Sequence, residues 1–302
     1  MAVLLDTVEL RAPAKVNLRL LVLERLASGY HALESLVCAL SLADTVRVAR
    51  GSGGVRLRVQ GAEQTGPPER NLAVLAAERF YAELGAAPAV EIELVKRIPA
   101  AAGLGGGSSD GAATLRALNA LHGEPLAPAT LLRLGGELGS DLPFFLAGSA
   151  YALAWGRGER LLALPPLPPR PVLVAHPGEP MPTPAAFRRL AEQRGVGHRP
   201  PALRFALADL SAWDGVAALA TNDFQAPAVA RIPRLGAALE RLRAAGASVA
   251  LLAGSGAALF GVFAAAAARD AAAGPLAALG FRTWAAETLS ALPAPTPGGR
   301  SG

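Results

Sequence analysis

A glycine-rich segment at residues 99–110 is the part of the sequence best suited to chemistry. It reads PAAAGLGGGSSD and lies between an alternating apolar segment and one with helical spacing. Glycines let the backbone approach a polyphosphate, and the start of the next helix adds unpaired N–H donors and partial positive charge. Ser108 and Ser109 supply hydroxyls for phosphate oxygens or Mg²⁺. The segment predicts a phosphate-binding loop, with a plain glycine turn capped by serine as the alternative.

The segment does not match the two commonest nucleotide-binding loops. A Walker A motif requires Gly-Lys-Ser/Thr, whereas Gly107 is followed by Ser108. The dinucleotide fingerprint requires a third glycine where Ser108 stands. Any phosphate loop here is therefore of another kind.

A second polar group lies on a predicted strand before the loop. Lys15 and Asn17, in PAKVNL, are two residues apart and so point to the same face of a strand. If that face lines a cleft, it presents a cation and an amide together. Tyr30 and His31 follow in a predicted turn. An exposed strand also carries a lysine without function, and the Tyr-His pair also suits ordinary turn packing.

Two further segments follow the loop. Asp141, in GSDLPFF, is an acid in a loop held by an aromatic pair, which suits a general base. A turn or helix-capping role for Asp141 is the alternative. Residues 254–256, Gly-Ser-Gly, form either a tight turn or a point where a second domain closes onto a ligand.

Lysine is scarce in this chain. Lys15 and Lys96 are the only lysines among 29 basic residues. In a composition biased toward arginine, lysine tends to remain where a compact ammonium is needed and a planar guanidinium does not fit. The bias therefore marks both lysines as candidate functional residues.

Composition also argues against several classes of protein. The net charge is +5, but basic residues are spread along the chain and aromatics are only 5%, which disfavours nucleic-acid binding and suits phosphorylated small molecules. Cys38 is the only cysteine, which excludes an intramolecular disulfide and fits a cytoplasmic protein. The first residues include acids and no basic region, unlike a signal peptide.

One uncharged segment, residues 247–268, is about as long as a membrane span. Glycines interrupt its centre and leave a short apolar run on each side. This pattern predicts two buried strands joined by a turn rather than a membrane helix.

Strands and helices are interleaved along the chain without strict βα repetition, which favours an α+β fold. The proline-rich segment 164–171 predicts a linker between residues 1–164 and residues 171–290, and residues 291–302 are expected to be a disordered tail. Strands are expected at residues 3–11, 16–23, 45–50, 55–60, 90–97, 172–176 and 281–287, and helices at residues 71–84, 109–121, 128–138, 184–193, 232–245 and 264–279.

Taken in order, PAKVNL, GYH, GLGGGSSD and GSDLPFF resemble the GHMP kinase superfamily of small-molecule kinases. The triple-glycine form resembles the members that phosphorylate a cytidine-diphosphate sugar alcohol in isoprenoid biosynthesis. The resemblance implies a mixed α/β N-terminal domain, a ferredoxin-like C-terminal domain and an active site in the cleft between them. It further implies ATP and Mg²⁺, no nucleic-acid or membrane partner, and a monomer or weak homodimer.

Site roles implied by the resemblance fall on matching positions. Asp141 corresponds to the catalytic base and a substrate contact, and Lys15 to its cationic partner. The resemblance places the substrate pocket at Asn17, Tyr30, His31 and Phe187, with cytosine between Tyr30 and Phe187. It places Asn71 and Lys96 near the adenine of ATP. The remaining nucleotide-binding residues that it implies are Pro99, Ala100, Ala101, Ala102, Gly103, Leu104, Gly105, Gly106, Gly107, Ser108 and Ser109.

Three positions depart from the family pattern: Ser28, Gly111 and Gln225 stand where aspartate, alanine and glutamate are usual. None belongs to the predicted chemistry. Two alternatives stay open: a kinase for homoserine or a mevalonate-like alcohol, and a non-catalytic protein that binds ATP and a metabolite.

Overall fold

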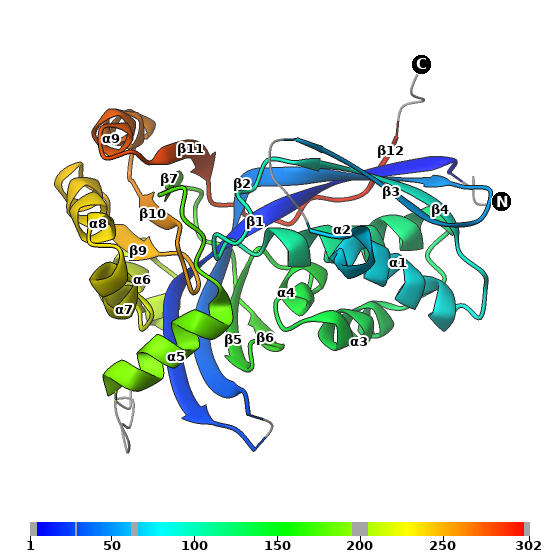
Figure 1. Ribbon diagram of the computed structural model, residues 1–302, viewed down its shortest axis with the longest axis horizontal. Helices are drawn as coiled ribbons and strands as arrows, with labels where there is room; N and C mark the ends of the chain where they lie inside the picture. Colours follow the sequence, from blue (N-terminus) through cyan, green and yellow to red (C-terminus); the bar gives the residue numbers. More distant parts are fainter. Residues whose placement is uncertain (1–4, 28, 62–65, 195–204, 299–302) are drawn as a thin grey trace.

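The computed structural model describes residues 5–27, 29–61, 66–194 and 205–298, which form two β-sheets with helices packed on them (Figure 1). The strands are β1 (Thr7–Arg25), β2 (His31–Arg50), β3 (Gly54–Gly61), β4 (Ala89–Lys96), β5 (Tyr151–Gly156), β6 (Arg160–Ala163), β7 (Pro171–His176), β8 (Thr221–Asn222), β9 (Val249–Leu252), β10 (Leu259–Val262), β11 (Arg282–Glu287) and β12 (Thr296–Pro297). The α-helices are α1 (Leu72–Glu83), α2 (Gly106–Leu121), α3 (Pro128–Leu138), α4 (Leu142–Leu146), α5 (Thr183–Arg194), α6 (Trp213–Leu219), α7 (Gln225–Arg231), α8 (Arg234–Ala244) and α9 (Ala266–Ala277). The predicted α+β class is confirmed.

The larger sheet is built on β1 and β2, which run across the whole molecule in Figure 1. Its strand order is β12-β1-β2-β4-β3, with β5 and β6 continuing from β2 and β8 pairing with β1. The smaller sheet has the order β11-β7-β10-β9. Helices α1 to α4 cover one face of the large sheet, and α8 and α9 pack on the small one (Figure 1).

The prediction of two strands at residues 3–11 and 16–23 was wrong. Residues 7–25 form one continuous strand, whereas residues 1–4 lie outside the described part. Pro13 cannot donate a ladder hydrogen bond, but the register between β1 and β2 shifts between Pro13 and Lys15. This bulge accommodates the proline without ending the strand.

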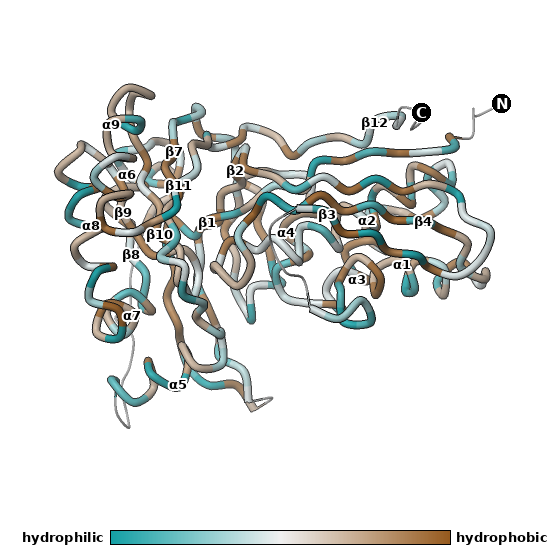
Figure 2. Tube along the Cα trace, turned by 45° about the horizontal axis from the view of Figure 1, so that its top comes forward, coloured by the Kyte–Doolittle hydropathy of each residue, from teal (hydrophilic) through white to brown (hydrophobic). Residues whose placement is uncertain are grey.

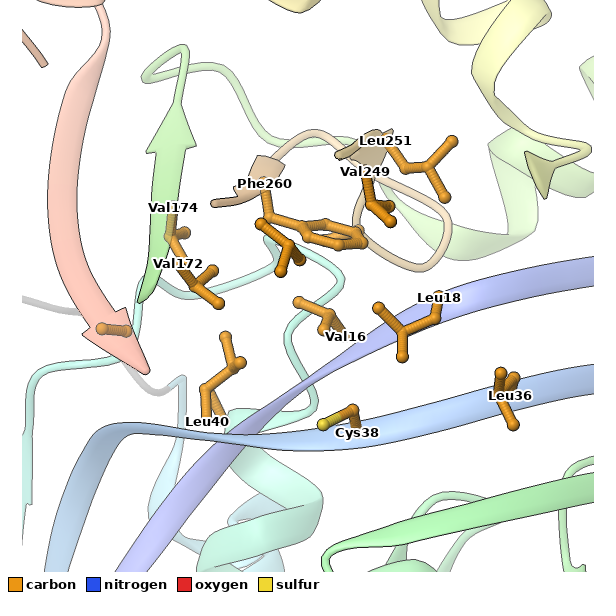
Figure 3. Packing of buried hydrophobic residues seen from close by; sticks show 14 of the residues in the cluster. Val16, Leu18, Leu36, Cys38, Leu40, Val172, Val174, Val249, Leu251 and Phe260 are labelled. Carbon is orange, nitrogen blue, oxygen red and sulfur yellow. The ribbon is translucent and has the colours of Figure 1, made fainter. Parts of the chain in front are cut away.

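A shared hydrophobic core joins the two sheets. Val16 and Leu18 of β1 point toward Val249 of β9 and Phe260 of β10 (Figure 3). All four side chains are almost completely buried. Figure 2 shows hydrophobic residues concentrated in the sheet strands, whereas α5 is mostly hydrophilic. The core therefore holds both halves of the molecule at fixed positions around the space between them.

The uncharged segment at residues 247–268 forms the predicted strand pair, β9 and β10, joined by a glycine turn. No helix in the described ranges is long and apolar enough to cross a membrane.

The expectation of a disordered tail was wrong for its described part. β12 pairs antiparallel with the start of β1, and the Gly298 N–H donates to the Thr7 carbonyl at 2.9 Å. An unpaired edge of β1 provides these hydrogen bonds, which proline-rich composition did not predict. Residues 299–302 lie outside the described part.

Candidate active site

A cavity of about 600 Å³ lies where β1, the glycine-rich segment and the β9–β10 turn meet. Its wall combines residues from both halves of the molecule, including Lys15, Gly105, Phe187 and Ser255. A site at the junction of two sheets can hold two ligands against each other, as a group-transfer reaction requires.

Glycines determine the local geometry of the segment predicted to bind phosphate. α2 begins at Gly106, and its N-cap is Gly105 with φ at 70°, so no serine caps the helix. Gly103 also has a positive φ, and a Cβ there would lie 2.0 Å from the Ala253 carbonyl oxygen. The Ala258 N–H donates to the Ala102 carbonyl at 3.2 Å. Glycine is thus required for the loop to pack against the β9–β10 turn while the N–H groups of α2 face the cavity.

Lys15 and Asp141 form an ion pair in the cavity wall. The Lys15 Nζ and the Asp141 Oδ2 are 3.6 Å apart, with the lysine buried and the aspartate half-exposed. Lys15 also donates to the Asn17 Oδ1 at 2.9 Å, and the Asn17 Nδ2 donates to the Ser35 Oγ at 2.7 Å. The predicted common face of Lys15 and Asn17 is confirmed. Asp141 occupies the N-cap position of α4 but makes no capping hydrogen bond with its side chain, so a capping role does not explain it.

Lys96 and Asn71 lie in the same wall, but their polar atoms are engaged within the protein. The Lys96 Nζ contacts Asp44 and donates to the Asp110 Oδ2 at 2.6 Å. The Asn71 Oδ1 caps α1 by accepting from the Ala73 N–H at 2.9 Å. Any contact of these two residues with a nucleotide must therefore use those N–H groups of the Lys96 ammonium and the Asn71 side-chain amide that make none of these hydrogen bonds.

The aromatic residues are not arranged as the simple pair around cytosine, Tyr30 and Phe187, that the resemblance implies. Phe187 lines the cavity, but it stacks on His31 with ring centroids 5.1 Å apart, which leaves no space for a base between them. Tyr30 is 60% exposed and lies under the Arg157 guanidinium, 5.4 Å from the ring centroid. Burial, followed by Arg25 and Arg194, lowers the pKa of His31, which favours its neutral form.

Most predicted site residues line one cavity, and three do not. Tyr30 and His31 lie outside its wall, and Ser109 is buried with its hydroxyl unpaired in the described structure. The predicted residues that line it are Lys15, Asn17, Asn71, Lys96, Pro99, Ala100, Ala101, Ala102, Gly103, Leu104, Gly105, Gly106, Gly107, Ser108, Asp141 and Phe187.

Sequence reasoning missed several polar residues at the site. Asp110 was noted only as the end of the glycine segment, and Asp44 not at all. Thr183 was also missed, and its hydroxyl oxygen lies 2.9 Å from that of Ser255, which belongs to the Gly-Ser-Gly segment considered above as a point of closure onto a ligand. A sequence signal existed for Asp44, since it is the only acid in the largely apolar residues 36–49.

The departures from the family pattern have local explanations. A Cβ at Gly111 would lie 3.1 Å from Leu142 Cδ2 and 3.1 Å from the Leu72 carbonyl oxygen, so glycine allows α2 to pack closely. The Gln225 Oε1 accepts from the Leu252 N–H at 3.1 Å beside the glycine turn. Ser28 lies outside the described residues.

Comparison with known proteins agrees with this geometry. Residues 71–149 match the family model "GHMP kinases N terminal domain", and residues 205–278 match "GHMP kinases C terminal".

Two relatives and one solved structure carry the name of the same kinase. The chain is 44% identical to a 4-diphosphocytidyl-2-C-methyl-D-erythritol kinase of Anaeromyxobacter sp. strain K, over 83% of this chain and 79% of the relative. It is 43% identical to the protein of the same name from Deinococcus radiodurans, over 88% and 87%. A crystal structure of 4-(cytidine 5'-diphospho)-2C-methyl-D-erythritol kinase matches with a TM-score of 0.78 and 38% identity, covering 93% of this chain and 98% of that one.

Proposed function

The chain belongs to the GHMP kinase family, and on that premise we propose that it transfers the γ-phosphoryl group of ATP to the 2-hydroxyl of 4-diphosphocytidyl-2-C-methyl-D-erythritol. The observation that carries the proposal is the Lys15–Asp141 ion pair in the same cavity wall as the N-terminus of α2. A base, a cation and a phosphate cradle thereby surround one space, as phosphoryl transfer to an alcohol requires.

The glycine loop is proposed to hold the ATP phosphates. The first N–H groups of α2 have no partners within the helix, and the helix dipole is positive at this end. Gly106, Gly107 and Ser108 form the first turn and line the cavity. These donors stabilise negative charge on the transferred group as it moves toward the acceptor.

Asp141 is proposed to take the proton of the acceptor hydroxyl, with Lys15 as its partner. The ammonium 3.6 Å away is placed to stabilise the developing alkoxide. Asn17 and Ser35 fix the direction of the ammonium through consecutive hydrogen bonds. The pair is therefore oriented before substrate binds.

Mg²⁺ is proposed to arrive with ATP. No group of three His, Cys, Asp or Glu residues within the described ranges could hold a metal ion alone. Mg²⁺ commonly takes its ligands from substrate phosphates, waters and one or two protein oxygens. Asp141 and the half-buried Ser108 offer such oxygens in the cavity wall. When bound, the ion would neutralise charge on the β- and γ-phosphates.

The cytidine portion is proposed to bind beside Phe187. Neutral His31 can donate from one ring nitrogen and accept at the other, which matches the mixed edge of cytosine. Because His31 already stacks on Phe187, the base binds by displacing His31 or by using the remaining surface of Phe187. Tyr30, which is exposed, is proposed to close over the base.

We also place the protein in the cytoplasm, where ATP is available.

One assay tests the proposed function. ATP consumption is measured with 4-diphosphocytidyl-2-C-methyl-D-erythritol, with homoserine, with mevalonate and without acceptor. We expect turnover only with the cytidine compound. Stimulation by homoserine or mevalonate alone would reject the substrate, and ATP binding without turnover on any acceptor would favour a non-catalytic binding protein.

A further inference from the structure

Three buried ionisable side chains meet beneath the glycine loop and take no part in the chemistry proposed above. Asp44 lies in β2, Lys96 ends β4, and Asp110 lies near the start of α2. The Lys96 Nζ contacts the Asp44 carboxylate and is 2.6 Å from the Asp110 Oδ2. Their side chains are 0–5% exposed, so the single Lys96 ammonium serves as the counter-charge of both carboxyl groups.

This cluster connects both ends of the loop. The Asp44 Oδ1 accepts from the backbone N–H of Arg97 at 2.5 Å and of Ile98 at 2.8 Å, where the chain leaves β4. Lys96 then links Asp44 to Asp110, where the chain has entered α2. The backbone from residue 97 to residue 110 is therefore fixed at both ends by one group of charges.

The balance of charge matters to an anionic ligand. Burial raises the pKa of Asp110 well above its ordinary value, the nearby Asp44 adds to this rise, and Lys96 opposes it. Burial lowers the pKa of Lys96, but the two carboxylates outweigh burial and raise it overall. Lys96 and Asp110 both line the cavity, so an unneutralised carboxylate here would repel a polyphosphate at the start of α2.

We propose that Lys96 acts as a positioning residue of the nucleotide site: it bridges Asp44 and Asp110, offsets part of their negative charge and so holds the phosphate loop ready for ATP, instead of acting as a ligand of the adenine. Two of its three ammonium N–H donors face these carboxylates. This inference rests on the proposed function, because it assumes that ATP occupies the loop.

A double-mutant cycle tests the role. ATP affinity is measured by calorimetry for the wild type, Lys96→Gln, Asp110→Asn and the double variant. We expect Lys96→Gln to weaken ATP binding at least tenfold, since the bridge between Asp44 and Asp110 is lost and the Asp110 carboxyl group in the cavity wall has no counter-charge. Asp110→Asn should change affinity less than threefold. The double variant should recover to within about threefold of the wild type, because the paired amides hydrogen-bond and one negative charge is gone.

The alternative role predicts a different cycle. If Lys96 contacts the nucleotide directly, the double variant stays as weak as Lys96→Gln, and the inference is overturned. Affinity for cytidine diphosphate, a probe of the acceptor site, should stay within twofold of the wild type in every variant. If cytidine diphosphate affinity falls together with ATP affinity in all variants, the inference is also overturned, because such a loss indicates general damage to the protein.

Folding and the proposed function are tested separately. Should Lys96→Gln not fold, the double variant alone decides, because retained ATP binding supports neutralisation and lost binding contradicts it. A wild type that binds no ATP would reject both the inference and the proposed function, whereas a wild type that binds ATP beside a weak double variant would reject only the inference.

Discussion

At the scale of single residues, Asp141 is the most direct test of the proposed chemistry. Asp141→Asn keeps the shape of the side chain and removes the proton acceptor, and it disturbs no helix cap because the side chain makes none. We expect kcat to fall by about 10²- to 10⁴-fold with ATP affinity nearly unchanged. Steady-state kinetics and calorimetry measure the two quantities. Turnover near the wild-type rate would exclude Asp141 as the base.

Lys15→Arg tests whether the site requires a compact ammonium. A Cβ at Gly105 would lie 2.9 Å from the Lys15 Cγ, so the loop passes directly over the lysine side chain. A guanidinium is larger and planar and would have to displace the loop or the Asn17 contact. We expect kcat to fall at least tenfold, although the charge is kept.

A matched arginine substitution serves as the control for Lys15→Arg. Glu24→Arg, at the mostly exposed end of β1, adds the same side chain away from the cavity and should leave kcat within twofold. Full activity of Lys15→Arg would show that charge alone suffices.

Residue composition pointed to two site residues independently of any motif. Scarcity of lysine marked Lys15 and Lys96 before the structure placed both in one cavity wall. It did not distinguish their settings, because one faces Asp141 and the other faces two buried carboxylates. Those partners are distant in sequence, and only the pairing of β2 with β4 brings Asp44 to Lys96.

At the scale of elements, glycine-to-alanine substitutions at two positions of the glycine loop are expected to have opposite effects on stability. Gly103→Ala places a Cβ 2.0 Å from the Ala253 carbonyl and strains a positive φ, so we expect at least about 2 kcal/mol of destabilisation. Gly107→Ala lies in the first turn of α2, and its nearest new contact is 3.8 Å away. It should leave stability unchanged or raise it by about 0.5–1 kcal/mol.

Urea unfolding of the two glycine variants measures the difference. Both substitutions add one methyl group to the same loop, so each controls for the other. Equal loss in both would mean that flexibility of the loop matters more than its packing on the β9–β10 turn.

Helices with strong periodicity were predicted well, whereas the two longest strands and the shortest elements were not. Of β2 (His31–Arg50), only residues 45–50 were predicted. The helix predicted at residues 128–138 matches α3 in both bounds. β1 was predicted as two strands, at residues 3–11 and 16–23, because a sequence alone does not reveal that a bulge keeps the strand continuous past Pro13. α4 and β8 have too few residues for a periodic pattern, and contacts with neighbouring elements determine them.

At the scale of the whole molecule, the two halves are less separate than the proline-rich segment suggested. Thr221 and Asn222 of β8, beyond the proposed linker, pair with β1 in the large sheet. Leu164 and Leu167, within residues 164–171, are buried in the core that joins the sheets. The segment proposed as a linker, residues 164–171, is therefore partly built into the core that joins the two sheets.

The C-terminal segment allows a test of how β12 stabilises the large sheet. β12 returns to the start of β1, and the Thr296 Oγ1 donates to the Glu9 carbonyl at 3.2 Å. The Pro293 carbonyl oxygen accepts from the Arg116 Nη2 at 2.7 Å. Deleting residues 293–302 removes these bonds and leaves the half-buried guanidinium without that partner, which should cost about 1–3 kcal/mol. The melting temperature should fall while kcat stays within twofold, because none of the described residues 293–298 lines the cavity.

A shorter deletion isolates the strand as the cause. Removing residues 299–302 keeps every bond described for β12, so its melting temperature should equal that of the full chain. The two truncations differ only in residues 293–298, and calorimetric melting of both assigns any loss of stability to that segment. If the longer deletion melts with the full chain, the return of β12 adds nothing to the large sheet. If it instead loses activity at a temperature where it remains folded, the edge of β1 influences the cavity through the strand that carries Lys15.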